Sequence, residues 1–256
     1  MKTSFVFELY HENSKLREGD IDLYTWINFV NSDFSIRNVI SNPILAYGCS
    51  TEISLPPVIE NKSISLYESL LKRRSQRAFE DTPCPIDLFS SLLTYSIKEN
   101  AEISYDDGIK WCFRPYPSGG GLYPIDVYIA ILNVENIPKG LYFYNSKNHS
   151  ISELENNDEL GSLKKALPTL EQEINKASFF IFLVSDLNKM AFKYQERAYR
   201  FALLECGHIA QNLLLSSTSL ELNSFPVGAF LDDEINACLN IDGISSNVQY
   251  IIAFGT

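Results

Sequence analysis

Two apolar segments with almost no charge, residues 125–132 and 177–185, constrain the fold of this sequence most strongly. Both are rich in β-branched and aromatic residues, and this pattern predicts strands that are buried within a sheet. Residues 140–145 and 150–154 flank a polar turn, which predicts a hairpin, and residues 249–254 predict a last strand. A β-sheet is therefore expected at the centre of the fold.

Helices are predicted in the segments between the strands. Ser65 and Glu68 have the spacing of a capping box, so one helix is expected to begin at Ser65 and to run toward residues 73–77. Leu66, Leu70 and Leu71 give this helix an apolar stripe. Other helices are expected over residues 21–30, 88–97, 189–219 and 232–239, of which 189–219 is the longest and contains no proline. Helices and strands are interspersed without a βαβ repeat, so the predicted fold class is α+β.

The composition favours an ordinary globular protein, because 45% of the 256 residues are hydrophobic and 21% are charged. We divide the chain into an N-terminal region, residues 1–60, to which no role is assigned, and a main domain, residues 61–256. No apolar stretch approaches the roughly 20 residues of a membrane-spanning helix. The apolar stretch at the start is too short for a signal peptide. A cytoplasmic protein without a membrane partner is expected.

Charge and residue types argue against further classes of function. The net charge of −11 would repel polyphosphate, so nucleic acid is not an expected partner, and any bound phosphate is expected in a local basic pocket. The five cysteines are scattered without a C-x-x-C pair, and the three histidines are far apart. Neither a disulfide framework nor a metal site is therefore expected.

Three guanidinium groups and a hydroxyl lie within five residues at the predicted end of the helix that begins at Ser65: Arg73, Arg74, Ser75 and Arg77. Arginine binds phosphate oxygens through paired hydrogen bonds, so this cluster is suited to trap an anion. The alternative is a solvated helix end whose cations complement the helix dipole. The residues alone leave both interpretations open.

A glycine-rich loop precedes the first buried strand and contains Pro117, Ser118, Gly119, Gly120 and Gly121. Consecutive glycines let the backbone approach a ligand closely, and the flanking prolines stiffen the turn. Tyr116 and Tyr123 would offer flat faces to a planar ligand. The loop lacks the spacing of a P-loop and of a Rossmann motif. The alternative is an ordinary loop that leads into a strand.

Two more segments carry candidate chemistry. Lys193 and Tyr194 lie near the start of the longest predicted helix, where Arg197 would share a face with Lys193 and depress the pKa of the lysine. A desolvated lysine beside a tyrosine can act as a base, and the alternative is an exposed cation beside a packed ring. Gly228 and Ala229 form a turn before an acidic helix start, where backbone amides can contact a ligand.

In this order, the four segments resemble the SagB-type dehydrogenases. This family lies within the nitroreductase superfamily and includes the oxidase subunits of thiazole/oxazole-modified microcin synthetases. The shared motifs are R-R-S-x-R, P-S-G-G-G-L-Y-P-I, F-K-Y followed by R-x-Y-R, and P-V-G-A-F, and the resemblance covers residues 63–256. Residues 117–125 and 192–204 carry most of its specificity.

The resemblance implies an α+β, nitroreductase-like fold, in which helices flank a central mixed or antiparallel sheet and FMN lies at a homodimer interface. It assigns Arg73, Ser75 and Arg77 to the phosphate and ribityl chain of FMN, with Arg74 contributing through its backbone. Pro117, Ser118, Gly119 and Gly120 would line the flavin from the partner subunit, and Gly228 and Ala229 would direct an amide at flavin N5. Many nitroreductases carry basic residues after the last strand, and this chain stops at Gly255 and Thr256. The arginine cluster is therefore expected either to hold the phosphate alone or to leave flavin affinity reduced.

The function implied is FMN-dependent oxidation of thiazoline or oxazoline rings in a peptide to thiazoles or oxazoles, in the biosynthesis of a ribosomal peptide natural product. Tyr194, assisted by Lys193, is expected to remove the acidic ring proton. Cyclodehydratase subunits are expected partners. Two alternatives stay open: an NAD(P)H-dependent nitro- or quinone reductase of the same fold, and a flavin-free scaffold subunit of a peptide-modifying complex.

Overall fold

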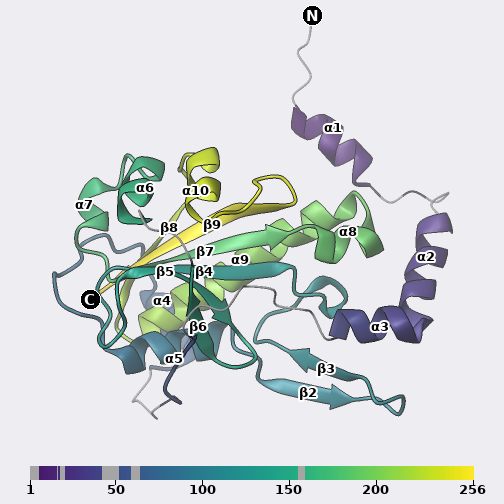
Figure 1. The fold of residues 1–256 in the computed structure, drawn as a ribbon, viewed down its shortest axis with the longest axis horizontal. Coiled ribbons are helices and arrows are strands. Elements are labelled where there is room, and N and C mark those ends of the chain that lie inside the picture. Colours follow the sequence, from purple (N-terminus) through teal and green to yellow (C-terminus); the bar gives the residue numbers. More distant parts are fainter. Residues whose placement is uncertain (1–5, 16, 18–20, 42–51, 59–63, 155–158) are drawn as a thin grey trace, which may run out of the picture.

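The computed structural model describes residues 6–15, 17, 21–41, 52–58, 64–154 and 159–256. Its centre is a seven-stranded sheet in the order β1-β6-β5-β4-β7-β9-β8, in which every neighbouring pair is antiparallel (Figure 1). The strands are β1 (Glu52–Ser54), β4 (Ile125–Ile131), β5 (Gly140–Asn145), β6 (Ser150–Glu153), β7 (Phe179–Asp186), β8 (Asn223–Val227) and β9 (Ser246–Gly255). The predicted strands are confirmed, and β1 and β8 are added to them at the two edges of the sheet.

The predicted α+β class is also confirmed, because helices cover both faces of this sheet (Figure 1). Along β4 the side chains alternate between the two faces. Val127 and Ile129 belong to the core on the side of α5 (Ile86–Ser96) and α9 (Arg197–Ser219). Tyr128 and Ala130 belong to the core on the side of α6 (Glu159–Ala166), α7 (Glu171–Ile174) and α10 (Asp232–Cys238). The central strands are thus shielded from water on both faces, which explains their nearly charge-free sequences.

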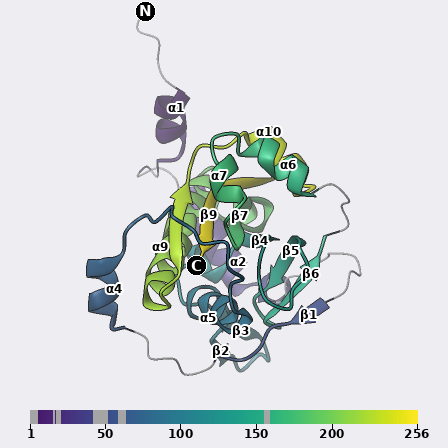
Figure 2. The same cartoon turned by 90° about the vertical axis from the view of Figure 1, so that its left-hand side faces the viewer.

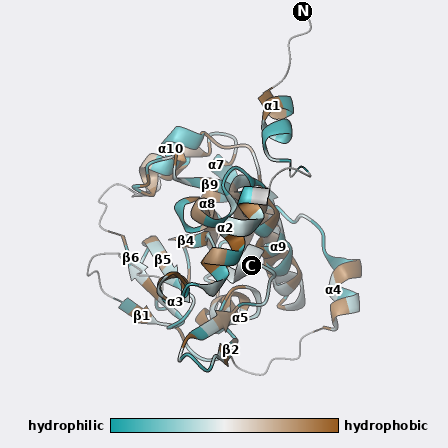
Figure 3. Ribbon diagram, turned by 90° about the vertical axis from the view of Figure 1, so that its right-hand side faces the viewer, coloured by the Kyte–Doolittle hydropathy of each residue, from teal (hydrophilic) through white to brown (hydrophobic). Residues whose placement is uncertain are grey.

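The helix predicted at Ser65 is confirmed as α4 (Leu66–Lys72). The Ser65 hydroxyl accepts a hydrogen bond from Glu68 N at 3.2 Å, and the Glu68 carboxylate accepts one from Ser65 N at 3.0 Å, which completes the capping box. The apolar stripe of α4 is nevertheless exposed, and its large side chains are Leu66, Tyr67, Leu70 and Leu71. Figures 2 and 3 show α4 at the periphery of the molecule, where it contacts α9. Nothing in the described part of the chain covers this stripe.

The single helix predicted over residues 189–219 is wrong, because the structure divides it into α8 (Asn188–Tyr194) and α9. Gln195 closes α8 through a hydrogen bond from its N to Ala191 O at 2.8 Å, and its backbone then leaves the helical region at φ 48° and ψ −133°. A non-glycine residue rarely adopts a positive φ, so the chain accepts local strain at this position. The break follows directly after Tyr194.

The N-terminal region contains α1 (Val6–Asn13), α2 (Ile21–Ser32) and α3 (Phe34–Ser41), and the helix predicted over residues 21–30 is confirmed as part of α2. Trp26 Nε1 donates a hydrogen bond to Phe192 O at 2.6 Å, which attaches α2 to α8. Strand β1 also precedes residue 60 and pairs with β6 in the main sheet. The division of the chain at residue 60 stays a prediction, but both sides of it contribute to one structure.

A separate hairpin, β2 (Ala101–Ser104) and β3 (Lys110–Phe113), extends from the main body beneath α3 (Figure 1). Arg37 on α3 forms an ion pair with Asp107 in the turn of the hairpin at 2.6 Å. In the described residues, no helix is both long enough and apolar enough to cross a membrane.

Replacement of Gln195 by glycine is expected to stabilise the protein by about 1 kcal/mol, because glycine adopts the positive φ without steric strain. The measurement is the free energy of unfolding in urea. The matched control is Glu196→Gly at the next position, where φ is −57°. Glycine relieves no strain there and adds freedom to the unfolded chain, so it should not stabilise the protein. Equal destabilisation by both changes would contradict the assignment of strain to Gln195.

Candidate active site

The glycine-rich loop and the Lys193–Tyr194 pair, which lie far apart in the sequence, meet in the structure. Gly119–Gly121 form one 3-10 turn, in which Gly120 has a φ of +64°. A Cβ atom at Gly120 would lie 2.5 Å from Tyr194 Oη and 2.9 Å from Lys193 Nζ. The positive φ favours glycine here, and any side chain would also force the ends of Lys193 and Tyr194 to move. The pair and the loop together are called the lysine corner (residues 117–121 and 193–194).

Hydrogen bonds and a small apolar cluster fix the loop of the lysine corner. Ser118 Oγ accepts a hydrogen bond from Tyr123 N at 2.9 Å, and Gly121 O accepts one from Trp111 Nε1 at 3.3 Å. Leu122, Met190 and Ala198 form a buried cluster beside it. The loop therefore has one defined shape before any ligand binds. Pro117 is exposed at its start, and Ser118 and Gly119 are half-buried.

The prediction that Tyr116 offers a flat face to a ligand is wrong, whereas for the half-buried Tyr123 it stays a prediction. Tyr116 is buried, and its hydroxyl accepts a hydrogen bond from Arg114 Nη1 at 3.0 Å. The ring of Tyr123 is covered by the Arg114 guanidinium, whose Cζ lies 4.8 Å from the ring centroid. Both tyrosines thus contact the half-buried Arg114, Tyr116 through its hydroxyl and Tyr123 through a ring face.

Lys193 is 5% exposed, and its Nζ donates a hydrogen bond to Asn31 Oδ1 on α2 at 2.8 Å. Burial lowers the pKa of the lysine, since an ammonium group loses hydration there. The direction agrees with the prediction, but the predicted cause is wrong. Arg197 lies beyond the helix break, and its Nη1 donates to Ser14 O at 3.0 Å instead of facing Lys193 along one helix.

Tyr194 is half-buried, and its ring forms an edge contact with the Phe201 ring, with the two ring centroids 5.0 Å apart. Burial raises the pKa of its phenol, because the tyrosinate form would lose hydration. The two pKa values thus move in opposite directions, down for the amine and up for the phenol. This favours a neutral amine beside a neutral phenol over an ammonium–tyrosinate pair.

A cleft of about 530 Å³ opens next to the lysine corner. One wall comes from α2 and α3, the other from the β2–β3 hairpin, and the floor from the loop; the lining residues are Val30, Asn31, Arg37, Ile40, Tyr105, Trp111, Phe113, Gly120, Gly121 and Lys193. The hairpin wall is aromatic, and the helix wall combines the apolar Val30 and Ile40 with the polar Asn31 and Arg37. The cleft therefore suits a flat, largely apolar group that is presented to an amine.

Glu205 is a buried titratable group that the sequence analysis missed. It lies on α9 at 2% exposure, and neither carboxylate oxygen has a partner with hydrogen-bond geometry in the described part of the chain. Burial raises its pKa to about 7, against the opposing influence of the nearby Ser118 hydroxyl and the Arg114 guanidinium. A charged residue between Leu204 and Cys206 on a mostly apolar helix was the signal that could have revealed it.

The arginine cluster lies elsewhere, along the outer edge of β8. Arg73 is half-buried, whereas Arg74, Ser75 and Arg77 are exposed, and no described carboxylate forms an ion pair with any of the three arginines. Gln76 N donates to Ser224 O at 2.9 Å, which attaches this segment to β8. The exposed turn at Gly228 and Ala229 follows the end of the same strand. These residues are called the arginine edge (residues 73–77 and 228–229).

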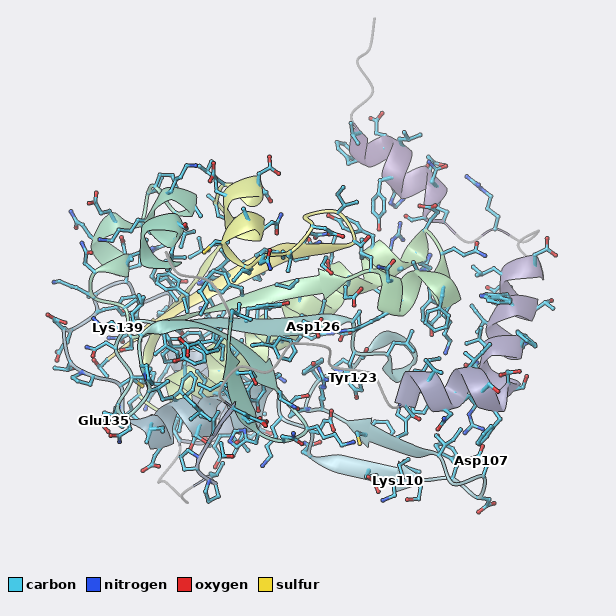
Figure 4. The ribbon with its side chains drawn as sticks, in the orientation of Figure 1. Asp107, Lys110, Tyr123, Asp126, Glu135 and Lys139 are labelled. Atoms are coloured by element: carbon cyan, nitrogen blue, oxygen red, sulfur yellow. The ribbon has the colours of Figure 1, made fainter. Side chains whose placement is uncertain are left out.

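The structure does not bring the arginine edge and the lysine corner together within one chain. Strand register places Ser224, which binds the arginine segment, level with Phe254, Phe179 and Ile131, whereas the glycine loop leads into Ile125. The turn at residues 228–229 follows the other end of β8, where Val227 is level with Tyr128. The separation along the sheet therefore concerns the arginines and the glycine loop. From Ile131 to Ile125 the strand spans about 20 Å at roughly 3.3 Å per residue. Figure 4 shows these two ends, with Tyr123 and Asp126 before and at the start of β4 and with Glu135 and Lys139 beyond its far end. A ligand that contacts both sets of residues must therefore bridge two chains or a long distance.

The donor types of the arginine edge fit a phosphate, because guanidinium groups without carboxylate partners are available to an anion. A hollow of about 330 Å³ lies beside Arg74, Lys72 and Ser224. The described residues contain no candidate metal site, that is, no cluster of three or more histidine, cysteine, aspartate or glutamate side chains that could hold an ion.

The chain is similar in sequence to known proteins. The sequence profile of the nitroreductase family matches residues 70–256. A Methanocaldococcus jannaschii protein described as a nitroreductase is 32% identical over 197 residues, which are 76% of this chain and 92% of that protein. The microcin B17-processing protein McbC of Escherichia coli is 32% identical over 134 residues, and the match spans 50% of this chain and about half, 49%, of McbC.

Solved structures share the fold. A chain of the Escherichia coli microcin synthetase McbBCD complex with truncated pro-MccB17 bound superposes with a TM-score of 0.60 at 22% identity, over 94% of this chain and 98% of that chain. A nitroreductase from a Desulfovibrio desulfuricans subspecies in complex with FMN superposes with a TM-score of 0.50 at 15% identity, over 77% of this chain and 87% of that chain.

Replacement of Gly120 by alanine is expected to destabilise the protein by about 1–3 kcal/mol, because the new Cβ overlaps Lys193 Nζ and Tyr194 Oη at a positive φ. The measurement is the free energy of unfolding. The control is Gly207→Ala in α9, where a Cβ meets nothing within 4 Å and should stabilise the helix. A neutral effect at Gly120 would show that the loop does not press on the pair.

Replacement of Glu205 by glutamine is expected to change how stability depends on pH. The folded-state pKa is raised from 4.5 to about 7, so the wild-type protein loses stability as pH rises through this window. The variant lacks this loss, and its stability relative to the wild type should grow by about 2–3 kcal/mol between about pH 5 and pH 8. Urea unfolding at both pH values measures the difference, and the exposed Glu135→Gln serves as the control. A pH-independent difference would contradict the buried titration.

Proposed function

This chain belongs to the nitroreductase family, and from that membership we propose that it is an FMN-dependent oxidase that converts thiazoline or oxazoline rings in a peptide to thiazoles or oxazoles. The observation that carries the proposal is the lysine corner, where a buried amine and a phenol lie against a glycine turn at the floor of an aromatic-walled cleft. An azoline ring is flat and small, and its oxidation requires the removal of a proton next to a carbonyl.

The pKa directions favour Lys193 as the group that takes this proton. Burial lowers the pKa of the amine and raises that of the Tyr194 phenol, so the amine is the better base of the two. This reverses the roles expected from the sequence, in which Tyr194 was the base. After proton transfer the Lys193 ammonium would stabilise the negative charge that develops on the substrate, and the Tyr194 hydroxyl would donate a hydrogen bond to it.

The arginine edge supports FMN as the cofactor. Arg73 and Arg77 would bind its phosphate together with Ser75, Arg74 would contribute through its backbone, and the turn at Gly228 and Ala229 would contribute backbone amides. FMN, when bound, supplies the acceptor for the two electrons that leave the ring. Pro117, Ser118, Gly119 and Gly120 would line the flavin from a second subunit, because these residues and the arginines at positions 73–77 lie at different ends of the sheet.

A homodimer is also proposed, and the exposed apolar side chains support it. Leu66, Tyr67, Leu70 and Leu71 on α4 are exposed, as are Leu203 and Leu204 on α9. The two helices contact one another, and clustered exposed apolar side chains are typical of a subunit interface. Covering it with a second copy would bury these side chains.

Cyclodehydratase subunits are the proposed partners of the dimer, in the cytoplasm. The supporting observation is the likeness of fold to a chain of the McbBCD complex, together with the partial sequence similarity to McbC. An azoline must be formed from a peptide before it can be oxidised, so an enzyme that makes the ring is needed upstream. A peptide that contains such rings is the proposed substrate.

An NAD(P)H-dependent nitro- or quinone reductase is the second candidate, because the Methanocaldococcus jannaschii relative is described as a nitroreductase and matches more of the chain than McbC does. Rapid reduction of bound flavin by NADH or NADPH, without oxidation of azoline peptides, would favour it. A flavin-free scaffold is the third, and a purified protein without flavin absorbance would favour that.

The substitutions Lys193→Ala and Tyr194→Phe are expected to slow azole formation about 100-fold or more and about 10-fold or more, respectively, with FMN content retained. Mass spectrometry of an azoline-containing peptide measures the reaction as a loss of about 2 hydrogens per ring, as a two-electron, two-proton oxidation requires. The wild-type rate should rise with pH through the lowered pKa of Lys193, since only the neutral amine accepts a proton.

Lys176→Ala, at an exposed position on the far side of the sheet from α9, is the control and should oxidise the peptide at the wild-type rate. Near-normal azole formation by the Lys193 variant would remove the lysine from the mechanism. FMN-loaded wild-type protein that never oxidises an azoline would reject the substrate class.

A further inference from the structure

The Lys193 amine has one hydrogen-bond partner in the described part of the chain, and that partner comes from outside the region matched by the family profile. Asn31 Oδ1 accepts from Nζ at 2.8 Å, and Asn31 lies near the C-terminal end of α2. The profile begins only at residue 70. The N-terminal helix therefore contacts the one side chain on which the proposed chemistry depends.

The position of Asn31 is set by several contacts of α2 and α3. Trp26 Nε1 donates to the backbone carbonyl of Phe192, the residue directly before Lys193, at 2.6 Å. The neighbouring Val30 is 1% exposed. Asp33 Oδ1 accepts from Ile36 N at 2.9 Å and begins α3. These contacts hold α2 against α8, so Asn31 reaches the amine from a fixed backbone.

An amide oxygen has a specific effect on a buried amine. It accepts a hydrogen bond from both the neutral and the charged form, so it orients the amine without a negative charge that would hold it protonated. A carboxylate in the same place would favour the ammonium form strongly. An aliphatic side chain would leave the nitrogen without a partner. Of these three choices, only the amide both holds the group and lets it accept a proton.

The other polar groups around the cleft do not take over this role. Arg37, on α3, is paired with Asp107 of the hairpin turn. Asp33 is used by the backbone of α3. Tyr105 and Trp111 come from the hairpin, and Tyr194 is the neighbour of Lys193 on its own helix. None of these residues presents a carboxylate to the amine.

We propose that Asn31 is a positioning residue of the active site, which holds the Lys193 amine beside Gly120 at the floor of the cleft. Helix α2 therefore belongs to the active site. The proposal deepens the proposed function and rests on it for the role of Lys193. The contact itself can be tested without any peptide substrate.

The test compares Asn31→Asp, Asn31→Leu and Asn31→Gln with the wild type in two measurements. The first is the labelling of Lys193 by trace acetic anhydride as a function of pH, read by mass spectrometry of the Lys193 peptide. The second is the pH profile of azole formation. Asn28→Asp, an exposed position one turn earlier on α2, adds the same charge to the same helix without the contact.

Asn31→Asp should move the labelling midpoint of Lys193 upward by about one pH unit or more, because a carboxylate at hydrogen-bond distance favours the ammonium. The rising limb of the rate profile should move in the same direction. Asn28→Asp should cause a much smaller shift. Asn31→Leu should lower the rate at all pH values without an upward shift, and Asn31→Gln should restore part of it. Thermal unfolding confirms that each variant is folded.

An unchanged labelling midpoint in folded Asn31→Asp would overturn the proposal. Equal shifts in Asn31→Asp and Asn28→Asp would also overturn it, because a general charge effect would then suffice. A shifted midpoint in a protein that oxidises no azoline would leave the Asn31 contact in place and reject the proposed reaction. The two failures are therefore distinguishable.

Discussion

The burial of the Lys193 amine against the backbone of Gly120 is the contact on which the rest of the site depends. An amine held away from water loses much of the hydration that stabilises its charge, so the surrounding chain must supply either a countercharge or a neutral partner. Here the partner is the amide of Asn31, and the space comes from a residue without a side chain. The strained turn at Gln195 ends α8 directly after the pair. Three separate parts of the sequence thus determine the surroundings of the Lys193 amine.

Much of the fold could be predicted from the sequence, because its causes are local. The nearly charge-free segments at residues 125–132 and 177–185 became central strands, and the Ser65 capping box began α4. The break at Gln195 could not be predicted, since glutamine and glutamate are good helix formers and tertiary contacts override their preference. The Asn31–Lys193 contact joins positions 162 residues apart, and no periodic pattern encodes such a pair.

The candidate site was predicted in its parts but not in its arrangement. The resemblance named the glycines, the arginines and the Lys193–Tyr194 pair, and the structure unites only the first and last of these in one chain. A linear order of motifs does not state which end of a sheet each motif occupies, because antiparallel strands reverse direction at every turn. Tyr116 shows the same limit, since a ring that looks available in a loop is buried and its hydroxyl is bound by Arg114.

The separation of the arginine edge from the lysine corner has a consequence for how the protein behaves as its concentration changes. If one flavin is shared by two chains, its apparent dissociation constant includes the constant for assembly of the dimer. Dilution would then release flavin without any damage to either set of contacts, and saturating flavin would hold the subunits together. The flavin absorbance of such a protein would therefore depend on the assembly of the dimer as well as on the binding of flavin to each chain.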